Sequence, residues 1–522
     1  MSPDESLETL LGTAARLRPD LPVEVVAGSV GAARVGRLVD DSRQVIPGAG
    51  FVARPGTVSD GRLHILDAIE RGATLVIAEP SAWDGIDPGS MKGIVALACP
   101  GPLELGTTLA NIRRGDPRSG LRIAGITGPN GKTTVASLVR QVLEAGVARC
   151  GSIGTIEIHD GVQAVPARVT TPGRLEIVEI LGDMVDNGCE LLAMEVSSHA
   201  LDQGRVEDLD FAVGVFTNLS GDHLDYHGTM EAYAAAKARL FRSLGEDAVA
   251  IVNLDDAASA SMLESCVAGT IGVTRLDVED RVAPAKVDRV VGIEILRNDA
   301  DGMRLRWTGI LDRPLEIDVP LIGVHNAFNA TASLLVAIEM GAEVSDAVEA
   351  IRGISAPRGR LEPVHEEGDS IRVYIDYAHT DDAIRTVLSA VRPFVPEDAA
   401  LVAVIGAGGD RDRTKRPRMM RAALENADRV VVTSDNPRTE DPAAIVAEVV
   451  GGATAGEASR FRQEVDRRRG IARAIEEASP GDVIVIAGKG HEAHQIVGTE
   501  RRPFDDRAVA REALSDRREG GR

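Results

Sequence analysis

The sequence predicts an α/β protein of three domains: a smaller N-terminal α/β domain, a central domain with a doubly wound, mainly parallel sheet, and a C-terminal Rossmann-like α/β domain. The chain has 522 residues, whereas single hydrophobic cores stop growing at about 250–300 residues. Short apolar runs alternate with segments of helical spacing, as in parallel sheets covered by helices. Aromatic residues make up 3% of the chain and glycines number 54, as expected where many turns join strands to helices. We place the domains at residues 1–115, 116–357 and 358–522.

The composition excludes several classes of protein. The formal net charge of −22 argues against nucleic acid as a partner, so an anionic ligand needs a local basic site. No apolar run approaches the ~20 residues that cross a bilayer, and the opening MSPDESLETLL lacks the basic and apolar segments of a signal peptide. The four cysteines are scattered without metal-binding spacing, which is typical of reduced, packed cysteines. We therefore expect a cytoplasmic protein without membrane insertion.

The N-terminal domain alternates short apolar strands with one good helix, Leu66 to Gly72, which the strand Ala73 to Ala78 follows. Its turn-rich segment DSRQVIPGAGFVARPG, Asp41 to Gly56, runs into TVSDG, Thr57 to Gly61. Such turn residues are either simple connectors, which is the commoner case, or contacts to a polar ligand such as a nucleotide-sugar. This segment alone does not decide between them.

The central domain opens with LRIAGITGPNGKTTVA, Leu121 to Ala136, which predicts a strand, a glycine turn and a helix that begins at Lys132. Backbone N–H groups at such a helix start point at one spot and attract an anion. Lys132 can reach the outer phosphates of a nucleotide there, and a threonine hydroxyl can hold Mg²⁺. The first glycine of the full motif is replaced by Ile126, and Pro129 has no N–H to donate. An ordinary strand-to-helix junction is the alternative, but we interpret this stretch as a phosphate-binding loop.

Three further residues are predicted near that loop. A buried-strand run, Cys189 to Val196, contains Glu195; the strand Phe211 to Asn218 leads to His223; and the helix Met230 to Leu244 carries Lys237. Ligands of open α/β sheets gather at the carboxyl ends of strands, so Glu195 and the pair Asp222-His223 should share an edge with the loop.

Each of these three side chains also has a plainer interpretation. Glu195 could cap a turn, His223 could be a satisfied loop histidine, and a helical lysine such as Lys237 is more often solvated. Together beside a triphosphate they suggest a Mg²⁺ site, provided that the lysine is anionic, because an ammonium repels a metal ion.

The third domain follows a linker, Pro357 to Arg360, and again alternates strands with helices. Its strands are predicted at Ile371 to Asp376, Leu401 to Gly406, Val430 to Ser434 and Val483 to Ala487. The last three lead into the loops IGAGGDRDRTKRP, TSDNPRTEDP and IAGKGHEAHQ. Arg411 and Arg438 supply guanidinium forks for carboxylates or phosphates. The loops either hold a small zwitterion between them or are surface salt-bridge loops.

Taken in order, these motifs resemble those of the ATP-dependent Mur ligases of peptidoglycan synthesis, most closely the MurE type, which adds the third residue of the stem peptide. The resemblance covers nearly the whole chain. The matching runs are DSRQVIPG with SDG, TGPNGKTT, TTP, MEVSSHALDQGRV, TNLSGDHLDYHG, YAAAKARLF, NLDD, GVHNAFNATA, IDYAHTDDAI, GAGGDRDRTKRPRM, DNPR, GKGHEAHQ and FDDR. So many matches in one order are more specific than any single motif.

The resemblance implies roles for the matching residues. Those that would bind ATP are Gly128, Pro129, Asn130, Gly131, Lys132, Thr133 and Thr134. Those that would bind the UDP-linked substrate are Ser42, with Thr57 to Ser59, and Thr170, Thr171, Ser197, Gln203 and Arg205. Those that would hold Mg²⁺ are Thr133, Glu195, His223 and Lys237, the last as a carbamate formed with CO₂. Those that would bind the amino acid are Arg411, Asp435, Asn436, Pro437, Arg438, Gly488 and Glu492. Lys132, Lys237, His223 and Glu195 would be catalytic.

The activity implied by the resemblance is ligation of meso-2,6-diaminopimelate to UDP-N-acetylmuramoyl-L-alanyl-D-glutamate, with ATP as co-substrate, by a cytoplasmic monomer. DNPR is associated in this family with diaminopimelate, and an arginine such as Arg438 can clamp its second carboxylate. The alternatives are an L-lysine-adding Mur ligase, a folylpolyglutamate synthase, which DNPR and the first domain fit poorly, and a nucleotide-binding homologue that has lost turnover.

The chain departs from the family pattern at five positions. These are Pro129, Ala407, Asp381, His325 and the additional Arg358. None of them removes a side chain with an implied ligand role. Pro129 has the clearest consequence, because it costs the loop one possible phosphate contact.

Overall fold

The structure is a computed structural model that describes residues 6–31, 33–56, 60–278, 286–366 and 368–519. Thr57 to Ser59 lie outside the described residues. The chain divides into two compact units, of which the first is Met1–Gly125 with Ala148–Val213 and Ala235–Ala248, and the second is Ile126–Val147 with Gly214–Ala234 and Val249–Arg522. The three-domain boundaries expected from the sequence stay a prediction.

A five-stranded sheet in the order β1-β5-β4-β3-β2 forms the N-terminal part of the first unit. Its strands are β1 (Glu24–Ala27), β2 (Leu38–Val39), β3 (Gly50–Ala53), β4 (Leu75–Ala78) and β5 (Val95–Ala98), and only β1 pairs antiparallel. Leu75 and Ile77 pack in one cluster with α1 (Leu7–Leu17) and α3 (Pro102–Arg113), whereas Val76 and Ala78 pack with α2 (Ile65–Glu70). Alternate side chains of β4 therefore pack against helices on opposite faces of the sheet.

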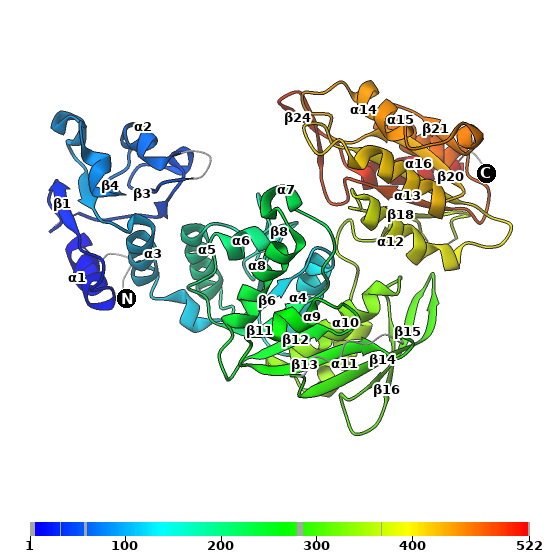
Figure 1. The fold of residues 1–522 in the computed structure, drawn as a ribbon, viewed down its shortest axis with the longest axis horizontal. Coiled ribbons are helices and arrows are strands. Elements are labelled where there is room, and N and C mark those ends of the chain that lie inside the picture. Colours follow the sequence, from blue (N-terminus) through cyan, green and yellow to red (C-terminus); the bar gives the residue numbers. More distant parts are fainter. Residues whose placement is uncertain (1–5, 32, 57–59, 279–285, 367, 520–522) are drawn as a thin grey trace. The chain divides into compact units, whose positions relative to one another are not determined.

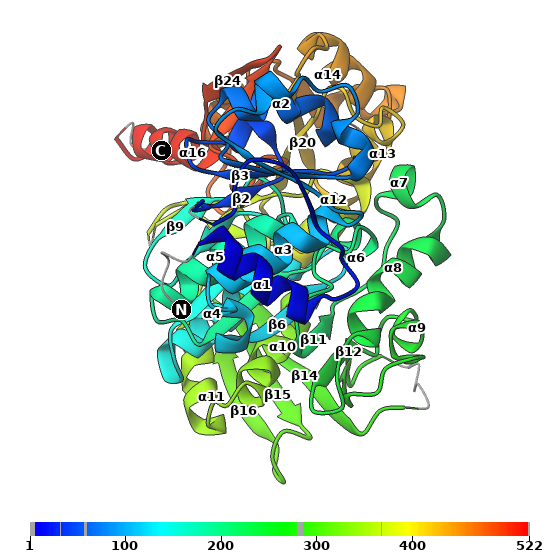
Figure 2. The same ribbon diagram turned by 90° about the vertical axis from the view of Figure 1, so that its left-hand side faces the viewer.

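Two of these three helices were missing from the sequence prediction, which gave this region one good helix. Helix α1 lies along α3 (Figure 2). It buries Leu7, Leu10 and Ala14, which share one helical face, and the Ser6 hydroxyl caps its start by accepting from Thr9 N. The expected helix at Leu66 to Gly72 corresponds to α2.

An eleven-stranded sheet in the order β16-β15-β14-β13-β12-β11-β6-β10-β7-β8-β9 follows. Its strands are β6 (Arg122–Thr127), β7 (Cys150–Ile153), β8 (Glu157–His159), β9 (Ala164–Pro166), β10 (Leu191–Glu195), β11 (Phe211–Phe216), β12 (Val249–Asn253), β13 (Gly269–Arg275), β14 (Arg289–Asp299), β15 (Gly302–Thr308) and β16 (Leu315–Val319). Strand β7 pairs parallel with β10, and β13 with β12 and β14. Antiparallel strands extend both ends, β15 and β16 at one and β8 and β9 at the other.

The helices of this region are α4 (Lys132–Gly146), α5 (Arg174–Asp186), α6 (Ser198–Asp202), α7 (Leu224–His227), α8 (Met230–Arg242), α9 (Ser259–Leu263), α10 (His325–Glu339) and α11 (Val344–Arg352). Helix α4 packs against α10 and α11 in the second unit (Figure 1). Every residue of α10 from Asn326 to Ala337 is buried, as in a helix enclosed on all sides. Trp307 Nε1 donates to Thr331 Oγ1 at 2.7 Å and joins β15 to this helix.

The C-terminal sheet has the order β17-β18-β22-β19-β20-β21, and only β17 pairs antiparallel. Its elements are β17 (Glu362–Pro363), β18 (Arg372–Asp376), α12 (Asp381–Val391), β19 (Leu401–Ala407), α13 (Lys415–Asn426), β20 (Arg429–Ser434), α14 (Pro442–Val450), β21 (Phe461–Gln463), α15 (Arg467–Glu476), β22 (Val483–Ala487), and α16 (Asp506–Glu519), with a separate hairpin of β23 (His494–Val497) and β24 (Glu500–Pro503).

Helices cover both faces of this sheet, as expected for a Rossmann-like domain (Figure 1). Val483 and Val485 of β22 pack in the cluster that contains α12, α13 and α14. Ile484 and Ile486 pack in the cluster that contains α15 and α16. The four strands predicted here all form, with bounds that differ by at most one residue.

Two expectations from composition can be compared with the structure. All four cysteines are buried and carry free thiols, as predicted. Within the described ranges, no helix is both long and apolar enough to cross a membrane.

Candidate functional site

The predicted phosphate-binding loop forms a tight turn between β6 and α4. Gly128 and Gly131 have φ values of +141° and +90°, which favour glycine. A Cβ at Gly128 would clash with Thr217 Oγ1. Lys132 Nζ donates to the carbonyls of Gly128 at 2.6 Å and Pro129 at 3.0 Å. The ammonium therefore lies over the turn at the positive end of the α4 dipole, where an anion would be attracted.

Side chains that follow β11 hold this loop. Thr217 Oγ1 donates to Asn130 O at 2.6 Å, and Asn218 Nδ2 donates to the same carbonyl at 3.0 Å. Asn253 Nδ2 in turn donates to Thr217 O at 2.7 Å. Sequence reasoning gave Thr217 and Asn218 no role, although both lie in the TNLS run at a strand end.

A residue of the linker also contacts the loop. Arg360 Nη2 donates to Thr133 Oγ1 at 3.2 Å, and the guanidinium lies 4.8 Å from the centre of the Tyr377 ring. Sequence reasoning treated Arg360 as part of a connector. The signal that could have found it is an arginine in a short interdomain segment rich in Pro and Gly.

In the first unit, Glu195 lies at the carboxyl end of β10 with 1% of its surface exposed. Thr155 donates to both carboxylate oxygens, from N to Oε1 at 2.7 Å and from Oγ1 to Oε2 at 2.9 Å. The Thr155 and Thr170 hydroxyls are 3.1 Å apart. Glu195 is thus held as an oriented carboxylate by Thr155, on another segment of the chain, rather than as the cap of the turn that follows it. Thr155 was missed by sequence reasoning.

Four more of the predicted residues gather around the same strand end. Thr171 Oγ1 donates to Glu195 O at 2.8 Å and accepts from Ser197 N at 3.0 Å. Arg205 donates from Nη1 to Thr171 O at 2.8 Å and from Nη2 to Gln203 Oε1 at 2.6 Å. Together with Thr170 and Glu195, these side chains form one connected group that offers hydroxyl, amide and guanidinium donors.

Ser42 lies elsewhere in the first unit, in the N-terminal sheet region. It is buried at the start of a short 3₁₀ turn, Ser42–Gln44, after Asp41. A hydrogen bond with Ser42, then one with Arg71, lowers the pKa of the Asp67 carboxyl. The hydroxyl therefore belongs to a polar group within that domain.

His223 and Lys237 differ in exposure. The His223 side chain is 48% exposed, its Nε2 lies 3.4 Å from Asp222 Oδ2, and its φ of +53° is unusual for a residue other than glycine. Lys237 on α8 is 1% exposed, which contradicts the interpretation as a solvated helix lysine. A lysine buried to this extent is rare unless it is paired.

The donor set can be tested for its fit to Mg²⁺. Within the described part of the chain, no group of three His, Cys, Asp or Glu side chains is arranged to hold a metal ion. The Glu195 carboxylate and the Thr133 hydroxyl are hard oxygen donors, as Mg²⁺ prefers. A carbamate on Lys237 would add two oxygens of the same kind, so the chemical type of each of these groups suits Mg²⁺.

In the C-terminal part, the loops after β19 and β20 are bound to each other. Arg438 has a φ of +51°, its N donates to Ile496 O at 3.0 Å, and its Nη1 donates to Gly409 O at 2.7 Å. A Cβ at Gly409 would clash with Pro437 O. Arg411 lies exposed on the loop after β19. The DNPR loop thus presents Arg438 from a fixed backbone.

The remaining residues predicted to bind the amino acid lie around the end of β22. Asn436 is 3% exposed and its Nδ2 donates to Glu492 Oε2 at 2.8 Å. Gly488 has a φ of +117°, and a Cβ there would lie 2.6 Å from Asp435 Oδ2. Lys489, a residue that sequence reasoning missed, donates to both Asn436 Oδ1 and Glu492 Oε2.

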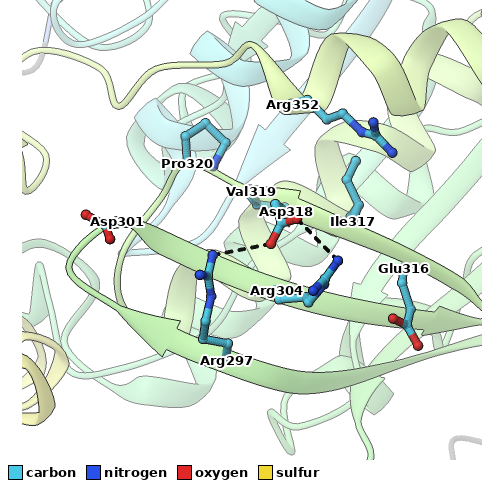
Figure 3. Close-up of a pocket in the computed structure, with 9 residues that line it drawn as sticks. All are labelled: Arg297, Asp301, Arg304, Glu316, Ile317, Asp318, Val319, Pro320 and Arg352. Carbon is cyan, nitrogen blue, oxygen red and sulfur yellow. Dashed lines mark hydrogen bonds and ion pairs between the residues drawn. The ribbon is translucent and has the colours of Figure 1, made fainter.

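One open cavity of about 330 Å³ lies outside all of these groups, beside β14, β15 and β16. Its charged lining includes Arg297 and Arg304, which pair with Asp318 at 3.3 Å and 3.6 Å (Figure 3). None of the predicted site residues lines it.

Comparison with family models matches two segments. Residues 126–337 match the Mur ligase middle domain, and residues 359–490 match the Mur ligase, glutamate ligase domain. These segments contain the phosphate-binding loop and the DNPR loop respectively.

Several known proteins are similar over nearly their full length. The UDP-N-acetylmuramoyl-L-alanyl-D-glutamate–2,6-diaminopimelate ligase of Gloeobacter violaceus is 41% identical over 93% of this chain and 94% of its own. That of Geobacillus thermodenitrificans is 39% identical over 92% and 94%.

Solved structures agree at the level of fold. A ligase of the same name has 31% identity and a TM-score of 0.64 over 99% of both chains. The MurF ligase of Thermotoga maritima in complex with ADP has 19% identity and a TM-score of 0.60, over 92% of this chain and 96% of its own.

Proposed function

The chain belongs to the Mur ligase family, and from this premise we infer that it is an ATP-dependent ligase that adds 2,6-diaminopimelate to UDP-N-acetylmuramoyl-L-alanyl-D-glutamate in peptidoglycan precursor synthesis. The observation that carries this inference is the 41% identity to such a ligase over 93% of the chain. The donor groups at the phosphate-binding loop, around Thr171 and Arg205, and at the DNPR loop support it, since each suits one of the three substrates.

The reaction begins with transfer of the γ-phosphoryl group of ATP to the D-glutamate carboxylate, which gives an acyl phosphate and ADP. Lys132 turns from the carbonyls of Gly128 and Pro129 to the phosphates and offsets the negative charge that gathers there. Backbone N–H groups at the start of α4 hold the same phosphates.

An amine of diaminopimelate then attacks the acyl carbon. A C–N bond forms, the tetrahedral intermediate collapses with loss of inorganic phosphate, and the amine proton passes to solvent or to the departing phosphate. Exclusion of water during this interval protects the acyl phosphate from hydrolysis.

Mg²⁺ would be held by Thr133, Glu195, His223 and the carbamate of Lys237, and would supply positive charge opposite the phosphates. The carbamate requires a neutral amine that reacts with CO₂. Lys237 is 1% exposed on α8, so a carbamate there would be shielded from bulk water.

The residues that would select the amino acid are Arg411, Asn436, Arg438 and Glu492. The meso form of diaminopimelate has a second carboxylate, which Arg438 would bind as a charge-assisted pair. L-Lysine has an ammonium at that end, which an arginine would repel. The UDP-linked substrate would contact Ser42 and the group of Thr170, Thr171, Ser197, Gln203 and Arg205. We expect the enzyme to act as a cytoplasmic monomer.

The test is phosphate release by the purified protein with ATP, Mg²⁺ and the UDP-linked dipeptide. Addition of meso-diaminopimelate should give sustained release, whereas L-lysine or no amino acid should give little. Equal release with L-lysine would contradict the amino-acid assignment, and no release in any arm would contradict the ligase function.

A further inference from the structure

We propose that Lys489 is a positioning residue of the amino-acid pocket, whose buried ammonium fixes the direction in which Asn436 and Glu492 offer hydrogen bonds to the incoming amino acid. This proposal rests on the ligase function proposed above and adds a residue on which its amino-acid specificity depends.

The side chain of Lys489 is fully buried, and lysine is almost never fully buried unless it is paired. Its Nζ donates to Asn436 Oδ1 at 3.1 Å and to Glu492 Oε2 at 3.0 Å. Lys489 is the second residue after β22, between Gly488 and Gly490, both of which have positive φ. The ammonium thus joins the loop after β22 to the loop after β20, and both loops supply proposed amino-acid ligands.

The contacts of Asn436 determine what it can recognise. Its Oδ1 accepts from Lys489 Nζ and also from Ile496 N at 2.9 Å. Two donors on one side of the amide identify that side as the oxygen and use both of its lone pairs. Nδ2 donates one hydrogen bond, to Glu492 Oε2. Asn436 therefore has only an N–H left to offer, and this suits a carboxylate rather than an ammonium.

Glu492, unlike Asn436, offers a hydrogen-bond acceptor. Asn436 Nδ2 and Lys489 Nζ both donate to Oε2, and no described residue donates to Oε1 in the structure. Burial raises the pKa of Glu492, but the charge of Lys489 and the hydrogen bonds from Asn436 and Lys489 outweigh it and lower that pKa overall. Glu492 is thus kept ionised, with one oxygen available to an ammonium.

A purely structural role for Lys489 would predict a general loss of stability on its removal. A positioning role predicts two further effects of removing the ammonium. The Asn436 amide is free to turn, and burial raises the pKa of Glu492 because the charge of Lys489 no longer lowers it. The binding of the amino acid should then weaken and become sensitive to mild acid, while the binding of ATP should not change.

The decisive variant is Lys489→Met, which keeps the length of the side chain and removes its charge. In phosphate-release assays with the full chain, the KM for meso-diaminopimelate should rise about tenfold or more. The KM values for ATP and for the UDP-linked dipeptide should stay within about twofold. In a plot of 1/KM for meso-diaminopimelate against pH, the fall on the acidic side (the acidic limb) should shift to higher pH by about one unit or more. The reason is that Glu492 without the charge of Lys489 takes up a proton at higher pH.

The matched control is Arg421→Met. Arg421 makes a two-pronged ion pair with Glu457, at 2.9 Å and 2.6 Å, in the same domain but outside the pocket. Its loss should lower thermal stability without moving the amino-acid KM or the acidic limb. If Lys489→Met leaves both quantities at wild-type values, or raises all three KM values together, the positioning role is wrong.

A second variant keeps the test decisive if Lys489→Met does not fold. Lys489→Met/Glu492→Gln removes both charges and leaves no buried ion unpaired. It should lack the acidic limb and have an amino-acid KM close to that of Glu492→Gln alone, since the two residues act as one unit. A wild-type KM in this double variant would overturn the proposal. Wild-type protein that is inactive with meso-diaminopimelate would instead overturn the ligase function, and the role of Lys489 with it.

Discussion

Three lysines of this chain have proposed roles that depend on where their amino groups are held. Lys132 Nζ donates to the carbonyls of Gly128 and Pro129, Lys489 Nζ donates to Asn436 Oδ1, and Lys237 is buried on α8. A variant at each position therefore tests a different step of the proposed reaction.

Replacement of Lys237 by Ala tests the carbamate directly. Ligation should fall by about 100-fold or more, as for the loss of one preorganised charge-stabilising group, and added bicarbonate should not restore it, because no amine remains to react. The measurement is phosphate release with and without bicarbonate. Lys286→Ala, which removes an exposed lysine, is the control and should keep full activity. Near-normal turnover of Lys237→Ala would exclude the carbamate.

Replacement of Arg438 by Ala tests the distal carboxylate clamp. The KM for meso-diaminopimelate should rise about 10- to 100-fold, the usual effect of a lost charge-assisted hydrogen bond, and the KM for ATP should change little. Arg502→Ala, at an exposed position of β24, serves as the control. An equal rise in both KM values would mean that Arg438 does not bind that carboxylate.

Sequence reasoning found residues whose role follows from a local pattern and missed those whose partners are distant. The loop at Gly128 to Thr134 was recognisable from its strand, glycines and lysine. Thr155, by contrast, holds Glu195 from 40 positions away in the chain, and Lys489 contacts Asn436 from 53 positions away. Neither spacing has a local signature, so only the folded chain reveals the pairs.

At the scale of elements, the missed helix α3 and the antiparallel hairpin show where sequence patterns mislead. Thr107 and Thr108 in α3 are β-branched, which lowers helix propensity, but their hydroxyls are satisfied within the helix because they donate to the carbonyls four residues earlier, both at 2.8 Å. Strands β14 and β15 are joined by two residues, Ala300 and Asp301, and β15 begins at Gly302, φ +129°, without the helix that a parallel crossover requires. Packing of α3 and the geometry of the turn before β15 therefore determine these two elements.

The ends of β20 and β22 are joined by a buried ion pair. Arg467 Nε and Nη2 donate to Asp506 at 2.7 Å and 2.6 Å, and both side chains are fully buried. The same guanidinium donates to Ser434 O at 3.3 Å and Ala487 O at 3.1 Å. These carbonyls directly precede Asp435 and Gly488, so the pair also holds the backbone beside two of the proposed amino-acid ligands.

Removal of one partner of this pair should be costly. Asp506→Ala leaves Arg467 buried without its counter-ion, and the free energy of unfolding should fall by about 3–5 kcal/mol. Denaturant unfolding of the full chain measures it. The double variant Arg467→Met/Asp506→Leu leaves no unpaired charge and should recover most of the loss. A single variant as stable as the wild type would show that the pair does not stabilise this domain.

At the scale of the whole molecule, the three groups of residues must serve one reaction if the chain is a ligase. The phosphate-binding loop suits ATP, the group around Glu195 and Thr171 suits a substrate with hydroxyl and carboxylate acceptors, and the DNPR loop suits a zwitterion. Each group is formed by segments far apart in the sequence, which is why motif order along the chain identified the family more readily than any one motif. The domain boundaries remain a prediction.

The most direct test is the mass of the product formed by purified protein from ATP, Mg²⁺, UDP-N-acetylmuramoyl-L-alanyl-D-glutamate and an equal mixture of meso-diaminopimelate and L-lysine. We predict one new species, heavier than the UDP-linked dipeptide by diaminopimelate less one water, with one ADP released for each molecule formed. A lysine-containing product of equal abundance, or ADP release without any ligated product, would contradict the account.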